Sequence, residues 1–352
     1  MKTTFISTVT LWKSPRSSLD RLQESLTKAN TELTTGRHAD VGLALGYKVG
    51  ESLSLRQQRA EIDTLTDSNG LAIQRLKTTT SALDGIRESA TKFRDALVGL
   101  PANPPVETIK SQAEAYMSSL IGNLNVSIGG QYIFGGINTK AAPANDYAGG
   151  SPLSLKGAVA TTFSAPAASG GFGFAQTNPL ASGITPGDMR TFLDGPFKQI
   201  FEGAGWNTLS NASDQNIQSL ISPTEKVETS TNASSTPMRQ IAMAYTMVFD
   251  LGIESLNPEA RNVVFTKAIE VLSSAISGLI NVQARIGTAQ ARTETAIQRM
   301  DLQKSIFDER IGGLEAVDPT EAKVRVDQLM TQIQTSYSLT AQLKQLSLIN
   351  YL

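Results

Sequence analysis

The chain has 352 residues, a formal net charge of −1 and a charged fraction of 18%, so it carries no basic excess that would neutralise phosphates. This balance argues against nucleic acid as a partner. The absence of cysteine excludes disulfides and thiolate metal sites. The N-terminus shows no apolar core of signal-peptide length, and no stretch approaches the roughly 20 apolar residues of a membrane span. We therefore expect neither a cleaved signal peptide nor a membrane span.

The first segment of the chain is predicted to form an amphipathic helix that begins at Ser14–Pro15. Its apolar residues are spaced alternately three and four apart, which is the pattern of a helix that packs one face against a partner helix. These residues are Leu19, Leu22, Leu26, Ala29 and Leu33.

A stripe with the same spacing predicts a long second helix, closed by Gly99 and Pro101. Its members are Ile62, Leu65, Ala72, Leu76, Leu83, Ile86, Ala90, Phe93 and Leu97. Pro104–Pro105 lead into a further amphipathic helix that ends near Leu124.

From about residue 138 to 236 the composition changes to Gly, Ser, Thr, Ala and Pro with brief apolar runs. Short strands and turns suit this composition better than helix does. We predict a small β-rich domain inserted between two helical halves. Its expected core is aromatic and consists of Phe163, Phe172, Phe174, Phe192, Phe197, Phe201 and Trp206.

A nearly uninterrupted stripe from Phe265 to Phe307 predicts a helix on the order of 60 Å long, opened by Asn257–Pro258. A strict three-four repeat over so many turns is typical of coiled coils and antiparallel helical bundles. We expect this stripe to pack on the stripe from Ile62 to Leu97. A last helix is predicted from Asp318–Pro319, after a break at Gly312–Gly313.

The predicted organisation has three parts: terminal helices in 1–45 and 318–352, a long-helix rod in 46–137 and 237–317, and the β-rich domain in 138–236. An apolar seam on a separate short helix needs a partner, so the two terminal seams form the candidate assembly interface. Its residues are Leu19, Leu22, Leu26, Leu33, Val326, Leu329, Ile333, Leu339, Leu343, Leu346 and Ile349.

Residues suited to catalysis are scarce. His38 is the single histidine, so no histidine pair can hold a metal, and no nucleophile elbow lies near it. The pairs Gly149–Gly150 and Gly170–Gly171 stand outside any phosphate-loop frame and are interpreted as surface turns. We predict no catalytic residues, no metal site, no cofactor and no enzymatic activity.

One segment resembles a family signature. Gly129, Gly130, Tyr132, Phe134, Gly135 and Gly136 stand in the order Gly-Gly-Gln-Tyr-Ile-Phe-Gly-Gly. This order resembles the signature of the flagellin-like hook-associated proteins of the bacterial hook–filament junction. Thr34–Arg37 with Asp40 resembles the turn that follows the first helix in flagellins and junction proteins. The end, Leu346–Leu352, is similar to the C-terminus of the alphaproteobacterial, rhizobial type. The resemblance covers roughly residues 1–140 and 237–352.

The resemblance implies a mainly α, flagellin-like fold: a long antiparallel helical bundle with paired N- and C-terminal halves, an inserted β-rich domain, and terminal helices that form an inner layer ordered on assembly. It implies a structural adaptor, a ring-like homo-oligomer, that joins the first hook-associated protein to flagellin and transmits torque. It further implies an extracellular location in the flagellum, export by the flagellar type III apparatus without a cleaved signal peptide, and an export chaperone.

Other functions stay open. Flagellin itself, the filament subunit, shares the layered design, although the Phe-Gly-Gly segment and the terminal Asn350–Leu352 favour the junction protein. A type III tip protein or a helical signalling adaptor would also contain long heptad stripes. The aromatic residues of 138–236 would suit a surface glycan-binding protein.

Overall fold

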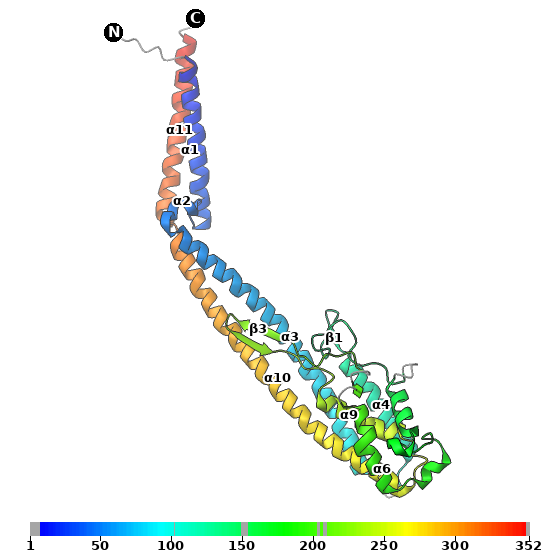
Figure 1. Cartoon of the computed structure of the whole chain (residues 1–352). Coiled ribbons are helices and arrows are strands. Elements are labelled where there is room, and N and C mark those ends of the chain that lie inside the picture. The colour runs from blue at the N-terminus through cyan, green and yellow to red at the C-terminus, as the bar shows by residue number, and fades with distance from the viewer. Residues whose placement is uncertain (1–7, 102, 149–153, 203–204, 207–209, 350–352) are drawn as a thin grey trace. The chain divides into compact units, whose positions relative to one another are not determined.

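The computed structural model describes residues 8–101, 103–148, 154–202, 205–206 and 210–349, and within these ranges the side chains of residues 17–342. The described chain is mainly α-helical, with two small antiparallel hairpins inserted between its helical halves (Figure 1). It divides into two compact units, Met1–Thr64 with Met300–Leu352, and Leu65–Arg299.

The first unit joins the two ends of the sequence. Its elements are α1 (Thr8–Thr35), α2 (Val41–Leu45), the 3₁₀ segment η1 (Gly46–Lys48), α11 (Pro319–Ile349), the beginning of α3 (Val49–Val98) and the end of α10 (Pro258–Glu315). Helices α1 and α11 lie side by side (Figure 1). An ion pair of 2.6 Å between Lys304 and Asp63 links α10 to α3.

The start of α11 follows the predicted capping pattern. The Asp318 carboxylate accepts hydrogen bonds from the backbone N–H groups of Thr320, at 2.7 Å, and Glu321, at 3.4 Å. These contacts satisfy donors that a helix leaves unpaired at its N-terminus. The start of α10 is capped similarly, because Asn257 Oδ1 accepts from the N–H of Ala260 at 2.8 Å.

Two predicted helix boundaries are wrong. Helix α10 continues through Gly312–Gly313 to Glu315, because a glycine costs a helix only about 1 kcal/mol relative to alanine. Helix α1 begins by Thr8 and continues through Pro15. An internal proline removes one backbone hydrogen bond and costs about 3 kcal/mol, which this helix of 28 residues accommodates.

The second unit contains the rest of α3 and α10 and all of the inserted segment. Its other elements are α4 (Val106–Leu124), β1 (Ser127–Ile128), β2 (Gln131–Tyr132), α5 (Leu155–Ser164), η2 (Ala167–Ser169), η3 (Pro179–Gly183), α6 (Pro186–Phe192), η4 (Leu193–Phe197), α7 (Lys198–Ile200), β3 (Gln218–Ser222), β4 (Glu225–Glu228) and α9 (Thr236–Asp250). Gly278 of α10 approaches Pro237 of α9 so closely that a Cβ at position 278 would lie 2.7 Å from the proline ring. This glycine allows the two helices to pack.

The predicted stripes are buried. On α3 the stripe members from Ile62 to Leu97 are buried, except Leu65, which is half-buried. On α10 burial follows the predicted stripe from Phe265 to Met300, after which Gln303 is exposed. Burial of these side chains at about 25 cal/mol per Å² is the main stabilising contribution to the helical core.

Two polar residues missing from the predicted α3 stripe, Asn69 and Thr79, have the same spacing and are fully buried. Asn69 Nδ2 donates to the backbone carbonyl of Ile221 on β3 at 2.8 Å, and Thr79 Oγ1 donates to the carbonyl of Arg75 at 2.8 Å. A buried polar group is costly unless it is hydrogen-bonded. Asn69 therefore ties the β3–β4 hairpin to α3, and Arg292 ties it to α10 through Glu225 at 2.8 Å.

The predicted fold class, mainly α with an inserted β region, is confirmed, although residues 138–236 contain less strand than expected. Among the described residues the strands of this segment are β3 and β4, while residues 155–200 are largely helical or in turns. Ser154 and Thr185 cap α5 and α6 by accepting from the N–H groups of Gly157 and Asp188. Local capping of this kind outweighs the Gly and Ser content on which the strand prediction rested.

The aromatic residues expected as the core of this segment do meet. Ring contacts with centroid distances of 4.8 to 6.3 Å connect Phe163, Phe172, Phe192, Phe197, Phe201 and Trp206 in succession. Phe163, Phe192 and Phe197 project from helical elements, and none of these rings lies on a described strand.

Phe93 should be a major contributor to the stability of the second unit. It is fully buried, and its ring centroid lies 5.4 Å from those of Tyr116 on α4 and Tyr245 on α9. Phe93→Ala is expected to lower the free energy of unfolding by about 3–5 kcal/mol, measured by urea denaturation followed by circular dichroism. Val98→Ala, at a side chain that is 64% exposed on the same helix, is the control and should change it by less than about 1 kcal/mol. Equal effects of the two substitutions would contradict this assignment of the core.

Candidate assembly surface

Helix α1 is followed by a tight turn, which forms backbone hydrogen bonds with the segment between α10 and α11. Gly36 has a φ of 67°, a left-handed conformation that favours glycine, and its N–H donates to the carbonyl of Glu32 at 2.9 Å. The N–H of Val317 donates to the carbonyl of Gly36, and the N–H of His38 donates to that of Glu315, both at 3.0 Å. The N- and C-terminal halves of the chain are therefore joined by backbone hydrogen bonds at this turn.

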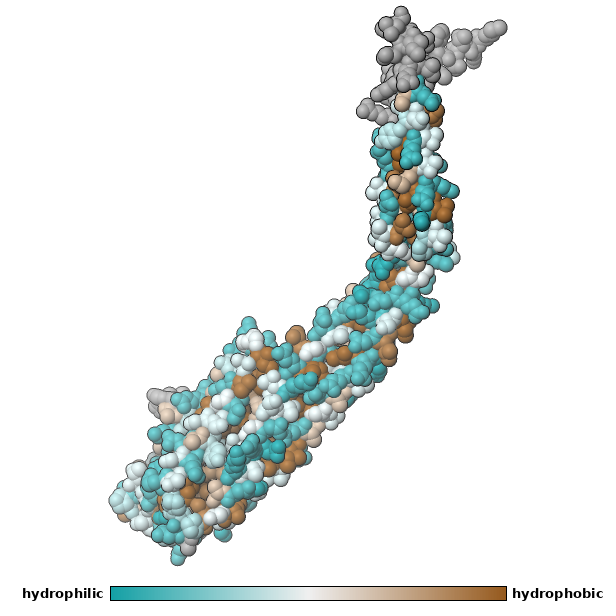
Figure 2. All heavy atoms as spheres, turned by 180° about the vertical axis from the view of Figure 1, so that it is seen from behind, coloured by the Kyte–Doolittle hydropathy of each residue, from teal (hydrophilic) through white to brown (hydrophobic). Residues whose placement is uncertain are grey.

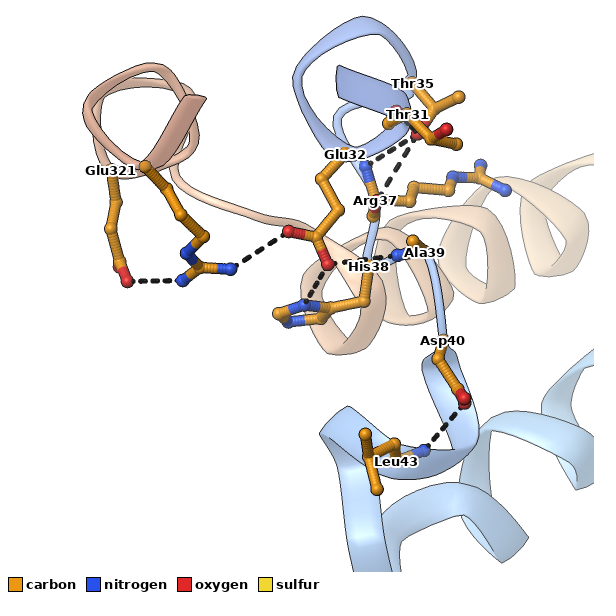
Figure 3. Close-up of polar contacts among 10 residues, drawn as sticks. Thr31, Glu32, Thr35, Arg37, His38, Ala39, Asp40, Leu43 and Glu321 are labelled. Atoms are coloured by element: carbon orange, nitrogen blue, oxygen red, sulfur yellow. Dashed lines mark hydrogen bonds and ion pairs between the residues drawn. The ribbon is translucent and has the colours of Figure 1, made fainter. Parts of the chain in front are cut away.

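The Glu32 carboxylate holds both terminal helices at the turn (Figure 3). It accepts from the N–H of Ala39 at 3.2 Å, lies 3.7 Å from His38 Nδ1, and pairs with Arg325 of α11 at 3.0 Å. Arg325 also pairs with Glu321 at 2.8 Å on its own helix. Because only 12% of the Glu32 side chain is exposed, solvent screens these contacts less than at an open surface.

The Glu315 carboxylate at the end of α10 is fully buried and surrounded by donors from the N-terminal half of the chain. Ser52 Oγ donates to it at 2.6 Å, Arg56 Nε donates at 2.9 Å and Arg56 Nη2 donates to its second oxygen, while Arg37 lies 3.9 Å away. The hydrogen bond from Arg56 is the main reason why the pKa of Glu315 lies below its ordinary value. Sequence reasoning missed this cluster because no spacing pattern links residue 315 to residues 52 and 56.

The predicted assembly residues do not all lie in one environment. Val326 and Ile333 are buried between α11 and α1, together with Ala29. The half-buried members are Leu19, Leu22, Leu26, Leu33 and Leu329. The side chains of Leu343, Leu346 and Ile349 lie outside the described residues. Part of the predicted seam is thus occupied within the chain by the opposite terminal helix.

Leu339 lies off the seam, and 54% of it is exposed. Steps of three and four from Ile333 lead instead to Ser336 and Thr340, which are half-buried. The prediction placed Leu339 on the seam because it followed apolar residues only. The seam continues with small polar residues, and Leu339 points away from it.

The middle part of α11 lacks the charged side chains that an exposed helix usually carries. Residues 328–343 contain no Asp, Glu, Lys or Arg, whereas α1 carries five charged residues between 20 and 32. The exposed apolar side chains on this part of α11 are Met330, Tyr337 and Leu339, each more than half exposed. Figure 2 shows hydrophilic, weakly polar and apolar side chains mixed over the visible face of the α1–α11 pair. Solvated helix faces normally carry charged residues, so this face is suited to contact with another uncharged surface.

The signature segment, Gly129–Gly136, packs closely against another part of the chain in the second unit. Phe134 is fully buried, and Gly136 has a φ of 63°. A Cβ at Gly136 would lie 2.5 Å from the carbonyl oxygens of Ser213 and Gln215, so a larger residue does not fit. The N–H of Ile137 donates to the Gln215 carbonyl at 3.0 Å. Gly136 is therefore needed where the chain after α4 passes against the chain before β3.

Within the described part of the chain, no group of three or more His, Cys, Asp or Glu side chains could hold a metal ion. Helix α10 is long and apolar enough to cross a membrane by length and composition, which the sequence analysis did not anticipate. The core helix of a soluble protein passes the same test, and the apolar stripe of α10 is buried.

Comparisons with known proteins identify the family. Residues 6–139 match the bacterial flagellin N-terminal helical region, and residues 269–352 match the bacterial flagellin C-terminal helical region. Together these regions cover more than half of the chain, which belongs to the flagellin family. It is a structural component of the bacterial flagellum, from a structural and non-enzymatic family whose members assemble with themselves and with other flagellar components.

Among solved structures, one described as "putative flagellar hook-associated protein from Vibrio parahaemolyticus" is 12% identical, with a TM-score of 0.49; the match covers 75% of this chain and 95% of that one. A likeness this distant carries no argument about function. No curated protein matches the chain.

The Glu315 cluster should make the stability of the first unit depend on pH. A carboxyl whose pKa is lowered by folding contributes stability above its unfolded value of 4.5, and this stability is lost as the pH falls through the folded-state pKa. Glu315→Gln should cost about 1–3 kcal/mol at pH 7 and flatten the loss of stability below about pH 4.5. Thermal unfolding between pH 3 and 7 measures both effects. Glu309→Gln, at an exposed position of the same helix, is the matched control; an unchanged acid profile in Glu315→Gln would refute this role.

Proposed function

We propose that this chain is a structural adaptor at the hook–filament junction, where it joins the first hook-associated protein to flagellin and transmits torque. The observation that carries the assembly role is the uncharged outer face of α11, on a terminal helix pair, in a chain of the flagellin family. The Gly129–Gly136 signature and the terminal Asn350–Leu352 favour the junction protein over the filament subunit. Flagellin itself is the second candidate.

In this proposal the terminal helices, 1–45 and 318–352, form an inner layer that becomes ordered on assembly. Neighbouring subunits of a ring-like homo-oligomer bury the exposed face of α11 around Leu339. The half-buried leucines of α1 supply further apolar area, and Leu343, Leu346 and Ile349 extend the same contact. Burial at about 25 cal/mol per Å² drives association, less the entropic cost of ordering the helices.

The wider setting belongs to the same proposal. The partners are the first hook-associated protein on one side, flagellin on the other, and an export chaperone before assembly. Export through the flagellar type III apparatus, without a cleaved signal peptide, delivers the chain to the extracellular flagellum. The helical remainder, 46–137 with 237–317, transmits the load, and 138–236 faces outward.

Immunogold labelling on flagella separates the two candidates, because a junction protein occupies one short zone and a filament subunit occupies the whole filament. We expect label only between hook and filament. We also expect a deletion strain to keep its hooks, lose its filaments and release flagellin into the medium. Label distributed along the filament would reassign the chain as a filament subunit.

Leu339→Asp tests the assembly face. The side chain is 54% exposed, so the substitution should leave helix content and thermal unfolding nearly unchanged. In the assembled wall it would bury a charge without a partner, and we expect at least a tenfold loss of motile cells in swimming assays. Leu180→Asp is the matched control, since Leu180 is 65% exposed in the second unit, far along the chain from α11. Normal filaments and swimming in the Leu339→Asp strain would rule out this face as the contact.

A further inference from the structure

A cavity at the N-terminus of α9, in the second unit, has features that the assembly function does not use. It measures about 370 Å³, large enough for a small ligand. The cavity is lined by Trp206, Asp214, Asn232, Ser234, Ser235, Thr236 and Arg239.

Polar atoms without partners are concentrated in the cavity wall. Among the residues that the structure describes, eight buried side-chain N or O atoms lack a hydrogen-bond partner. Four of the eight belong to cavity-lining residues: Trp206 Nε1, Ser234 Oγ, Ser235 Oγ and Arg239 Nε. Trp206 is 5% exposed and Ser234 is 7% exposed, so water reaches neither freely. Buried polar groups are normally hydrogen-bonded, and a cluster of unpaired ones indicates a missing partner.

The chemistry of the wall favours a negatively charged partner. An indole N–H and a guanidinium Nε–H can only donate hydrogen bonds. Arg239 donates through Nη1 to the carbonyl of Phe201 and through Nη2 to Thr236 Oγ1, both at 3.3 Å, and it forms no ion pair with the described residues. Its charge is therefore held in place but not neutralised.

The N-terminus of α9 also favours a negatively charged ligand. Ser235 is the N-cap of α9, a helix of 15 residues, yet its side chain makes no capping hydrogen bond. The N-terminus of a helix carries a partial positive charge that stabilises an anion. Asp214 is the opposing charge, and it is exposed, where solvent screens it.

We propose that this cavity binds an oxyanion, the carboxylate or phosphate group of a small ligand, between the first turn of α9, Arg239 and the indole N–H of Trp206. Ser234 and Ser235 complete the site as hydroxyl donors. The site is separate from the terminal helices, so its occupancy does not depend on the junction role.

Trp206 provides a direct readout. Trp12 is the other tryptophan of the chain, so a ¹⁵N-labelled full chain carrying Trp12→Phe gives a single indole N–H resonance. Titration with inorganic phosphate, sodium acetate or sodium glucuronate should shift this resonance saturably at millimolar concentration. The probe with the tightest binding identifies the group. Glucose and sodium chloride, at matched concentration, should leave the resonance in place.

The variants test the assignment of residues. Arg239→Gln should weaken binding at least tenfold. Arg261→Gln is the matched control and should stay within twofold, because Arg261 Nε is also buried without a partner but does not line the cavity. Ser234→Ala should weaken binding severalfold. If Arg239→Gln fails to fold, Ser234→Ala is the variant that tests whether the cavity binds the oxyanion. The proposal is overturned by the absence of a saturable shift up to 50 mM of every oxyanion, by an equal response to glucose or chloride, or by equal losses in Arg239→Gln and Arg261→Gln.

Discussion

The stability of the first unit depends on how the buried negative charge of Glu315 is compensated. A carboxylate excluded from water is destabilising unless cations and hydrogen-bond donors surround it. Here Arg56 and Ser52 at the start of α3 supply them, and the backbone of the turn at Gly36 pairs with the segment just after Glu315. All of these groups come from the N-terminal half, so they hold the end of α10 against the start of α3 and the turn at Gly36. Helix α11 begins shortly after this point, at Pro319, and packs alongside α1.

The helical core was predictable because its period extends over many turns. Thirteen positions from Phe265 to Phe307 repeat the three-four spacing, and local exceptions cannot hide such a signal. The errors arose where single residues were given too much weight. Gly312–Gly313 was interpreted as a break, although a helix tolerates glycine when its backbone hydrogen bonds continue, and Asn69 was omitted from the stripe because it is polar. The inserted segment, rich in Gly and Ser, contains more helix than its composition indicates because Ser154 and Thr185 act as caps.

The candidate assembly surface could be predicted from the sequence only in part. Periodicity located both terminal seams, but it could not show that Val326 and Ile333 face α1 of the same chain, because that depends on the turn at Gly36. Leu339 was predicted to belong to the seam because it is apolar. Its angular position on the helix places it outside the seam. Neither the Glu315 cluster nor the cavity beside α9 has a sequence signature. The cluster joins Glu315 to residues 52 and 56 of the other half of the chain, and the cavity joins residues 232–239 to Trp206 and Asp214 without any motif spacing.

The two terminal helices divide opposing requirements between them. A subunit must stay soluble before assembly and then bury much of its surface, and charged side chains favour the first state while penalising the second. Helix α1 carries its charges on positions such as Glu24 and Lys28, which are exposed and pair with each other at 2.8 Å. Between residues 328 and 342, helix α11 presents Gln, Thr and Ser between its exposed apolar side chains. Amide and hydroxyl groups are solvated in the free subunit, yet they cost far less to bury than an ionised group and can hydrogen-bond across a contact. A face of this composition gives modest affinity for each contact, so the proposed assembly relies on many such contacts made together.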